Sequence, residues 1–135
     1  MCSSDLLSIK KALVIVGGDG HDELSADQPS VIKEITSSSI KESEFDPRNI
    51  FESTQAHQGG TALENAEVFK SIMENGDVDH AVSKLIAVNA GAAFYCSGKT
   101  DSIQEGIALS LSLIETGKVW QKYLQYKTLS HSIFQ

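Results

Sequence analysis

An uninterrupted apolar run near the start of the chain most constrains its fold. Ala-Leu-Val-Ile-Val occupies positions 12–16 without alternating polar residues. Such a run is typical of a strand buried on both faces, as in a parallel sheet covered by helices. The run stops at a loop rich in glycine and acid, Gly17-Gly18-Asp19-Gly20-His21-Asp22-Glu23. Open α/β sheets bind ligands at the carboxyl ends of such strands, so this loop is the first candidate site.

The remaining pattern predicts a hairpin followed by helices. Residues 31–35 and 40–45 flank three serines and predict two half-exposed hairpin strands. Thr61 and Glu64 have capping-box spacing at the start of a helix that Asn75-Gly76 ends. Further helices are predicted over 78–97, from a cap at Asp101 or Ser102 to Gly117, and over 119–129, and residues 4–11 read as the end of another helix.

These elements predict the α/β fold class: one buried strand, a β-hairpin and about four C-terminal helices. No repeat or linker divides the 135 residues, so residues 1–135 are expected to belong to one domain. One buried strand and a hairpin do not complete a doubly wound sheet, because strand edges need partners. We therefore expect the chain to be part of a larger α/β domain.

Charge and composition exclude several functions. The chain has 11 Lys+Arg against 18 Asp+Glu, a formal charge of −7, and Arg48 is its single arginine. Nucleic-acid binding is not expected, since it needs clustered basic side chains. No apolar run approaches the ~20 residues of a membrane span, and the run at 12–16 is too short for a signal peptide. Two cysteines, Cys2 and Cys96, make no disulfide framework, which points to a reducing compartment and a cytoplasmic location.

The acidic pair Asp22-Glu23 is the candidate metal site. Mg²⁺ in proteins is usually held by one or two carboxylates together with substrate phosphates. The alternative, that the pair only solvates a loop, stays open on this pattern alone. Other features predict structural roles: Asn89 as a satisfied amide, Gly91-Ala92-Ala93 as close helix packing, Gly59-Gly60 as a turn, Cys96 as core, and His21, His57, His80 and His131 as surface residues.

The order of the motifs resembles the C-terminal part of the anthranilate phosphoribosyltransferase family. The resemblance covers roughly residues 6–129. It is carried by Gly17-Gly18-Asp19-Gly20-His21-Asp22-Glu23-Leu24-Ser25, Gly59-Gly60-Thr61-Ala62-Leu63-Glu64-Asn65-Ala66, Asn89-Ala90-Gly91-Ala92-Ala93-Phe94-Tyr95, Glu105-Gly106 and Gly117-Lys118.

The resemblance implies a nucleoside phosphorylase/phosphoribosyltransferase-type α/β domain and a specific reaction. The phosphoribosyl group of phosphoribosyl pyrophosphate passes to the amine of anthranilate in tryptophan biosynthesis, with Mg²⁺ as cofactor. Asp22 and Glu23 match the family's metal-holding D-G-x-D-E loop and are expected to be the Mg²⁺ ligands. His21 and Val16 depart from the family pattern, and the roles of Asp19 and His21 stay open.

The resemblance also implies missing parts. The family's G-T-G-G-D substrate loop, its anthranilate contacts and its N-terminal helical domain all correspond to sequence upstream of Met1. We therefore expect a truncated C-terminal portion that is inactive alone, with no catalytic or substrate-binding residue assigned and a separately encoded N-terminal half as a partner. Two alternatives stay open: a pyrimidine nucleoside phosphorylase, and a non-catalytic relative or remnant that binds nucleic acid or another partner.

Overall fold

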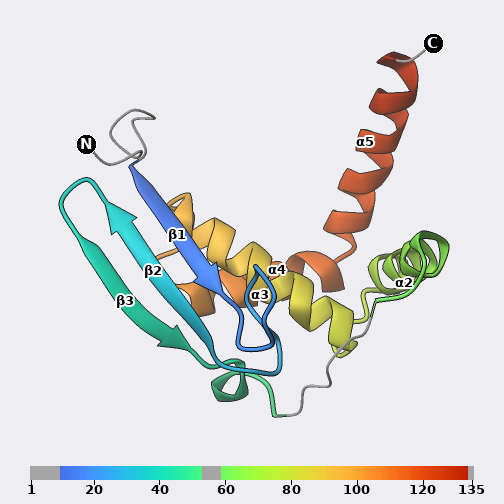
Figure 1. The fold of residues 1–135 in the computed structure, drawn as a ribbon. Helices are drawn as coiled ribbons and strands as arrows, with labels where there is room; N and C mark the ends of the chain where they lie inside the picture. Colours follow the sequence, from blue (N-terminus) through green and yellow to red (C-terminus); the bar gives the residue numbers. More distant parts are fainter. Residues whose placement is uncertain (1–9, 53–58, 134–135) are drawn as a thin grey trace.

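The computed structural model describes residues 10–52 and 59–133 as a small sheet packed against helices (Figure 1). The three strands form an antiparallel sheet in the order β1-β2-β3. Helices α3 and α4 lie side by side against one face of this sheet, and α5 projects away from it (Figure 1). The elements are β1 (Lys11–Val16), β2 (Ser30–Thr36), β3 (Ile40–Phe45), the 3-10 helix η1 (Pro47–Asn49), α2 (Ala62–Asn75), α3 (Ala81–Cys96), α4 (Ile103–Glu115) and α5 (Lys118–Ile133).

The α/β class, the hairpin and the four helices are confirmed, but the setting of the first strand is not. β1 pairs antiparallel with β2, and Ile15 lies opposite Ile32. Leu13 and Ile15 pack against the core, whereas Val14 and Val16 are 49% and 60% exposed. The expectation of a strand buried on both faces in a parallel sheet is therefore wrong for the described residues. An apolar run without alternation does not tell which face of a strand is covered.

Local capping chemistry sets the helix ends. The Thr61 side chain accepts from the Glu64 amide, and the Glu64 carboxylate accepts from the Thr61 amide at 2.8 Å, which confirms the capping box. Gly76 ends α2 in the left-handed conformation, with φ of 67°. Ser102 caps α4, as one of the two predicted alternatives.

Two helices differ from their predicted lengths. α3 begins after a His80 cap, three positions later than residue 78, and α5 extends to Ile133 rather than 129. The helix predicted over 4–11 lies mostly outside the described residues, and Lys11 belongs to β1. In the described part of the chain, none of the helices combines the length and apolar character that crossing a bilayer requires.

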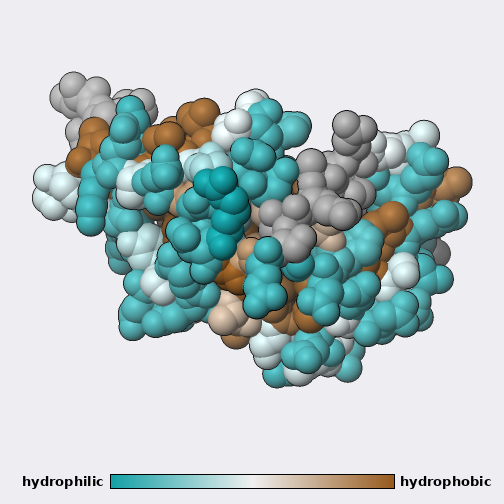
Figure 2. Space-filling view, turned by 90° about the horizontal axis from the view of Figure 1, so that it is seen from below, coloured by the Kyte–Doolittle hydropathy of each residue, from teal (hydrophilic) through white to brown (hydrophobic). Residues whose placement is uncertain are grey.

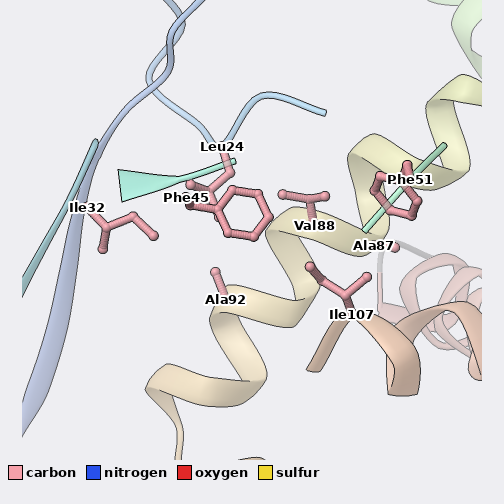
Figure 3. Packing of buried hydrophobic residues seen from close by; sticks show 8 residues of the cluster. All are labelled: Leu24, Ile32, Phe45, Phe51, Ala87, Val88, Ala92 and Ile107. Carbon is pink, nitrogen blue, oxygen red and sulfur yellow. The ribbon is translucent and has the colours of Figure 1, made fainter. Parts of the chain in front are cut away.

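The main core lies between the sheet and the α3–α4 pair (Figure 3). Its buried members come from the β1–β2 loop, the strands, the segment after η1, and both helices: Leu24, Ile32, Phe45, Phe51, Ala87, Val88, Ala92 and Ile107. Leu24 is fully buried, although it comes directly after the exposed Asp22-Glu23 pair. The core therefore reaches up to the candidate site.

Two glycines let α3 and α4 cross closely. A Cβ added to Gly106 would lie 2.3 Å from the Gly91 carbonyl oxygen, and one added to Gly91 would lie 2.6 Å from the Ile107 nitrogen. Backbone therefore packs against backbone at the crossing, which confirms the close helix packing predicted for Gly91-Ala92-Ala93.

A tyrosine joins α3 to the sheet. The Tyr95 hydroxyl donates to the Glu34 carboxylate of β2 at 2.6 Å, and the Lys11 ammonium lies 3.8 Å from the centre of the Tyr95 ring. The hydrogen bond to Glu34, together with burial, raises the pKa of Tyr95 above its ordinary value.

A smaller cluster of Ile72, Met73 and Ile114 joins α2 and α4 beside α5. None of the described residues of α5 is fully buried, and Tyr126 and Ile133 are more than 60% exposed. Seen from below, the surface is mainly hydrophilic, with several separate apolar patches (Figure 2).

Candidate metal-binding loop

The glycine pair that follows β1 allows the loop to fold back on itself. A Cβ on Gly18 would lie 2.0 Å from the Pro29 carbonyl oxygen, and one on Gly17 would lie 2.6 Å from the Glu23 carbonyl oxygen. No side chain fits at either position without moving the backbone. Internal packing thus accounts for Gly17-Gly18, and no phosphate cradle is needed to explain it.

A tight turn closes the loop just before the acidic pair. The Gly20 amide donates to the Gly17 carbonyl at 3.0 Å, and the Gly17 amide donates to the His21 carbonyl at 2.9 Å. Gly20 has φ of 88°, a backbone conformation that favours glycine. The backbone is therefore held at His21.

Asp19 and His21 belong to this turn. Asp19 Oδ1 accepts from the His21 amide at 3.1 Å and lies 3.2 Å from His21 Nδ1. Partial burial acts to raise the pKa of Asp19, but hydrogen bonds from the His21 amide and the His21 ring hold it below its ordinary value. One oxygen of Asp19 is thus occupied in holding the turn.

The backbone is held again directly after the acidic pair. The Leu24 amide donates to Asn89 Oδ1 at 2.9 Å, and Asn89 Nδ2 donates to the Leu24 carbonyl at 3.0 Å. The Ser25 amide then donates to the buried Ser30 hydroxyl at 3.0 Å. The same Asn89 Nδ2 also donates to the Leu85 carbonyl within α3, at 3.1 Å. These bonds confirm the structural role predicted for Asn89 and join the loop to both α3 and β2.

Asp22 and Glu23 form a short exposed span between these two fixed points. Within residues 10–52 and 59–133, neither carboxylate takes part in a hydrogen bond or ion pair. Their oxygens therefore face solvent as potential ligands.

The two carboxylates of Asp22 and Glu23 suit Mg²⁺ better than a metal ion whose ligands all come from the protein. No group of three or more His, Cys, Asp or Glu side chains in the described part of the chain is placed to hold an ion. Two carboxylates are the number that Mg²⁺ commonly takes from a protein, because water and phosphate oxygens complete its octahedron. The pair thus fits a magnesium ion shared with a phosphate ligand.

Other candidate groups are already engaged. The Gly60 and Thr61 amides donate to Asn65 Oδ1 and Glu64 Oε2, at 2.9 and 2.8 Å, so these two amides are not free to bind an anion. Gly59 and Gly60 are irregular backbone, and the predicted turn is not seen there. Arg48 forms two side-chain hydrogen bonds with Asp46, at 2.9 and 2.7 Å.

The predicted surface histidines differ in their setting. His21 is exposed and belongs to the turn, His80 caps α3, and His131 is exposed on α5. His57 lies outside the described residues. Cys96 is half-buried rather than part of the core, and its thiol lies 3.6 Å from the Lys11 carbonyl oxygen.

Comparison with known proteins places this fold in a class. The chain belongs to the glycosyl transferase family, because the model of that family's a/b domain matches residues 3–120. It is 34% identical over 114 residues to the anthranilate phosphoribosyltransferase of Rubrobacter xylanophilus, covering 82% of this chain and 33% of the relative. It is 31% identical over 124 residues to that of Desulfosudis oleivorans, covering 90% and 36%. The resemblance read from the sequence is thus confirmed.

Solved structures agree on the fold. An anthranilate phosphoribosyltransferase from Thermus thermophilus superposes with a TM-score of 0.73 at 27% identity, covering 86% of this chain and 34% of the other. A Saccharomyces cerevisiae variant with Mg bound gives a TM-score of 0.71 at 18% identity, covering 88% and 35%, which supports the fold alone. The chain spans about a third of the length of the relatives it matches. None of these matches supports a separately encoded N-terminal half.

Proposed function

We propose that Asp22 and Glu23 hold Mg²⁺ for a phosphoribosyl transfer from phosphoribosyl pyrophosphate to anthranilate. The observation that carries the proposal is the adjacent, exposed carboxylate pair between two hydrogen-bonded backbone points, in a member of the glycosyl transferase family. Relatives are named for this activity, and the S. cerevisiae protein has been solved with Mg bound and in complex with phosphoribosyl pyrophosphate and Mg.

The chain's own contribution is to concentrate negative charge at a defined place. Two adjacent carboxylates with no cationic partner in the described residues favour a divalent cation over none. The hydrogen bonds at His21 and Leu24 reduce the motion of the pair before a metal arrives, so less order is lost on binding. A bound Mg²⁺ supplies neutralisation of the charge that develops on the departing pyrophosphate.

The proposal for residues 1–135 is limited to this part of the reaction. We assign no residue of the chain to catalysis or to anthranilate binding, and we expect the chain alone to give no turnover, because a metal pair without a substrate cradle does not align the reacting centres. We propose the cytoplasm as its location. The engagement of Arg48 by Asp46 supports an activity without nucleic acid.

A chimeric enzyme tests the proposal. The third of the T. thermophilus enzyme that superposes on this chain is exchanged for residues 6–129, and anthranilate consumption is followed by fluorescence with phosphoribosyl pyrophosphate over a range of Mg²⁺. We expect Mg²⁺-dependent consumption that is strongly reduced by Asp22→Asn with Glu23→Gln. The isolated chain is assayed in parallel and is expected to be silent.

The matched control is Glu42→Gln with Glu44→Gln, which makes the same charge change on the exposed strand β3. It is expected to leave the Mg²⁺ dependence of the chimera as it was, and thermal unfolding of each variant shows that it is folded. If the Asp22→Asn, Glu23→Gln chimera keeps the same activity and the same Mg²⁺ dependence, the proposal is wrong.

A further inference from the structure

Asn89 makes contacts that a merely space-filling residue of α3 would not. Its Oδ1 accepts from the Leu24 amide at 2.9 Å, and its Nδ2 donates to the Leu24 carbonyl at 3.0 Å. Both backbone groups of one loop residue are therefore bound by one side chain. The two residues are 65 positions apart in the sequence, so the contact joins two otherwise separate parts of the fold.

The Asn89 amide is itself held in place. Its Nδ2 also donates to the Leu85 carbonyl one turn earlier in α3, at 3.1 Å. α3 is in turn packed through Val88 and Ala92 into the main core, next to Leu24 (Figure 3). The loop is thus bound to a helix whose Val88 and Ala92 side chains are buried in the main core.

The contact between Asn89 and Leu24 fixes the backbone directly beside the Asp22-Glu23 pair. Leu24 directly follows Glu23, and the opposite end of the exposed span is held by the bond from Gly17 to the His21 carbonyl. Only Asp22 and Glu23 lie between the two fixed points. Groups that hold metal ligands in position without contacting the metal raise the metal affinity, because the ligands are already ordered before binding.

We infer that Asn89 is a positioning residue that sets the Asp22-Glu23 pair for its cation by binding the backbone of Leu24. The inference rests on the proposed function, since it takes that pair to be the metal site. It assigns Asn89 no contact with metal, substrate or any reacting atom. Its effect passes entirely through the Leu24 backbone.

The test uses Mn²⁺ as the probe and the full chain as it is. Calorimetric titration with Mn²⁺ alone is compared for the parent chain, Asn89→Leu and Asn89→Gln. Leucine keeps the size but removes all three hydrogen bonds, and glutamine keeps the amide but displaces it by one methylene. We expect Asn89→Leu to weaken Mn²⁺ binding about tenfold, as loss of groups behind metal ligands does elsewhere. Asn89→Gln is expected to weaken it by a smaller factor, while retaining the fold.

A second readout follows the contact without any metal. Amide hydrogen exchange at Leu24, measured by NMR, is expected to rise by roughly an order of magnitude in Asn89→Leu, while exchange in the core of α3 changes little. The matched control is Ser110→Ala, which removes a buried hydrogen bond on α4, to the Gly106 carbonyl at 2.8 Å. This control is expected to lower stability but to leave both Mn²⁺ affinity and Leu24 exchange as in the parent.

The outcomes separate the inference from the proposed function. If the parent chain binds Mn²⁺ through Asp22 and Glu23, and folded Asn89→Leu and Asn89→Gln bind it equally well, the inference is overturned and the proposed function stands. If Asp22→Asn with Glu23→Gln binds Mn²⁺ as the parent does, the proposed function fails and the inference falls with it. A tenfold loss in Asn89→Leu with an unchanged control supports both.

Discussion

Alanine in place of Gly91 puts a methyl group where α3 crosses α4. That carbon would lie 2.6 Å from the Ile107 nitrogen and 3.0 Å from the Gly106 carbonyl carbon. Both are backbone atoms, so no side-chain rotation relieves the contact and the helices must separate. Ile107 is 1% exposed, and the separation would loosen its packing in the main core.

Two opposing effects decide the magnitude. Glycine to alanine inside a helix gains about 1 kcal/mol in helix propensity when nothing is in the way. Overpacking of a core that cannot adjust costs about 3 kcal/mol, the upper part of the usual range, because the contacts here are with backbone. We therefore expect Gly91→Ala to lower the free energy of unfolding by about 2 kcal/mol.

Urea denaturation followed by circular dichroism measures this difference. The matched control is Ser112→Ala on the exposed face of α4, where the methyl meets solvent and propensity alone acts. The control is expected to be neutral or slightly stabilised. A Gly91→Ala chain as stable as the parent, or more stable, would refute the close backbone crossing.

Two further substitutions test other contacts. Tyr95→Phe removes the hydrogen bond to Glu34 and is expected to cost about 1 kcal/mol in urea denaturation. In the folded chain the pKa of Tyr95 is raised above 10.0, so its contribution to stability is fully present below that pH and is lost as the pH rises through the folded pKa. The free energy of unfolding of the parent should therefore fall more steeply above pH 10.0 than that of Tyr95→Phe. Equal slopes would contradict this. Gly76→Ala puts a side chain on a backbone in the left-handed conformation, with its Cβ 2.8 Å from the Glu115 carbonyl oxygen. The free energy of unfolding is expected to fall by about 2 kcal/mol, measured by thermal unfolding. An unchanged melting temperature would argue against this helix end.

Elements with local chemical signals could be predicted from the sequence. The Thr61-Glu64 capping box and the Asn75-Gly76 stop depend on atoms within one turn of helix, and both ends of α2 lie where they were expected. The hairpin strands likewise follow from two short runs around a serine turn, with the predicted second run matching β3 at both ends.

The environment of the first strand could not be predicted in the same way. Residues 12–16 are all apolar, without alternating polar residues, so the sequence pattern does not indicate which side chains face the helices. The structure exposes Val14 and Val16 and covers Leu13 and Ile15. The packing of α3 and α4 against one face of the sheet decides this, and it depends on residues far along the chain.

The sequence proposes ligand candidates for the site but does not show the contacts that support them. Asp22 and Glu23 stand out through composition and through the resemblance to a family. The contact between Leu24 and Asn89 spans 65 positions and leaves no local pattern beyond an amide on an apolar helix face. The chain also passes close to Gly18 at Pro29, and sequence spacing does not show this contact.

Localised broadening of amide NMR signals by Mn²⁺ tests the central claim most directly. Added to the parent chain in substoichiometric steps, Mn²⁺ is expected to broaden the amides of Asp22 and Glu23 before those near other exposed acids, such as Glu42 and Glu44. Asp22→Asn with Glu23→Gln is expected to abolish that preference. Equal broadening at both places in the parent, or a preference that persists in the doubly substituted chain, would contradict the assignment of this pair as the metal ligands.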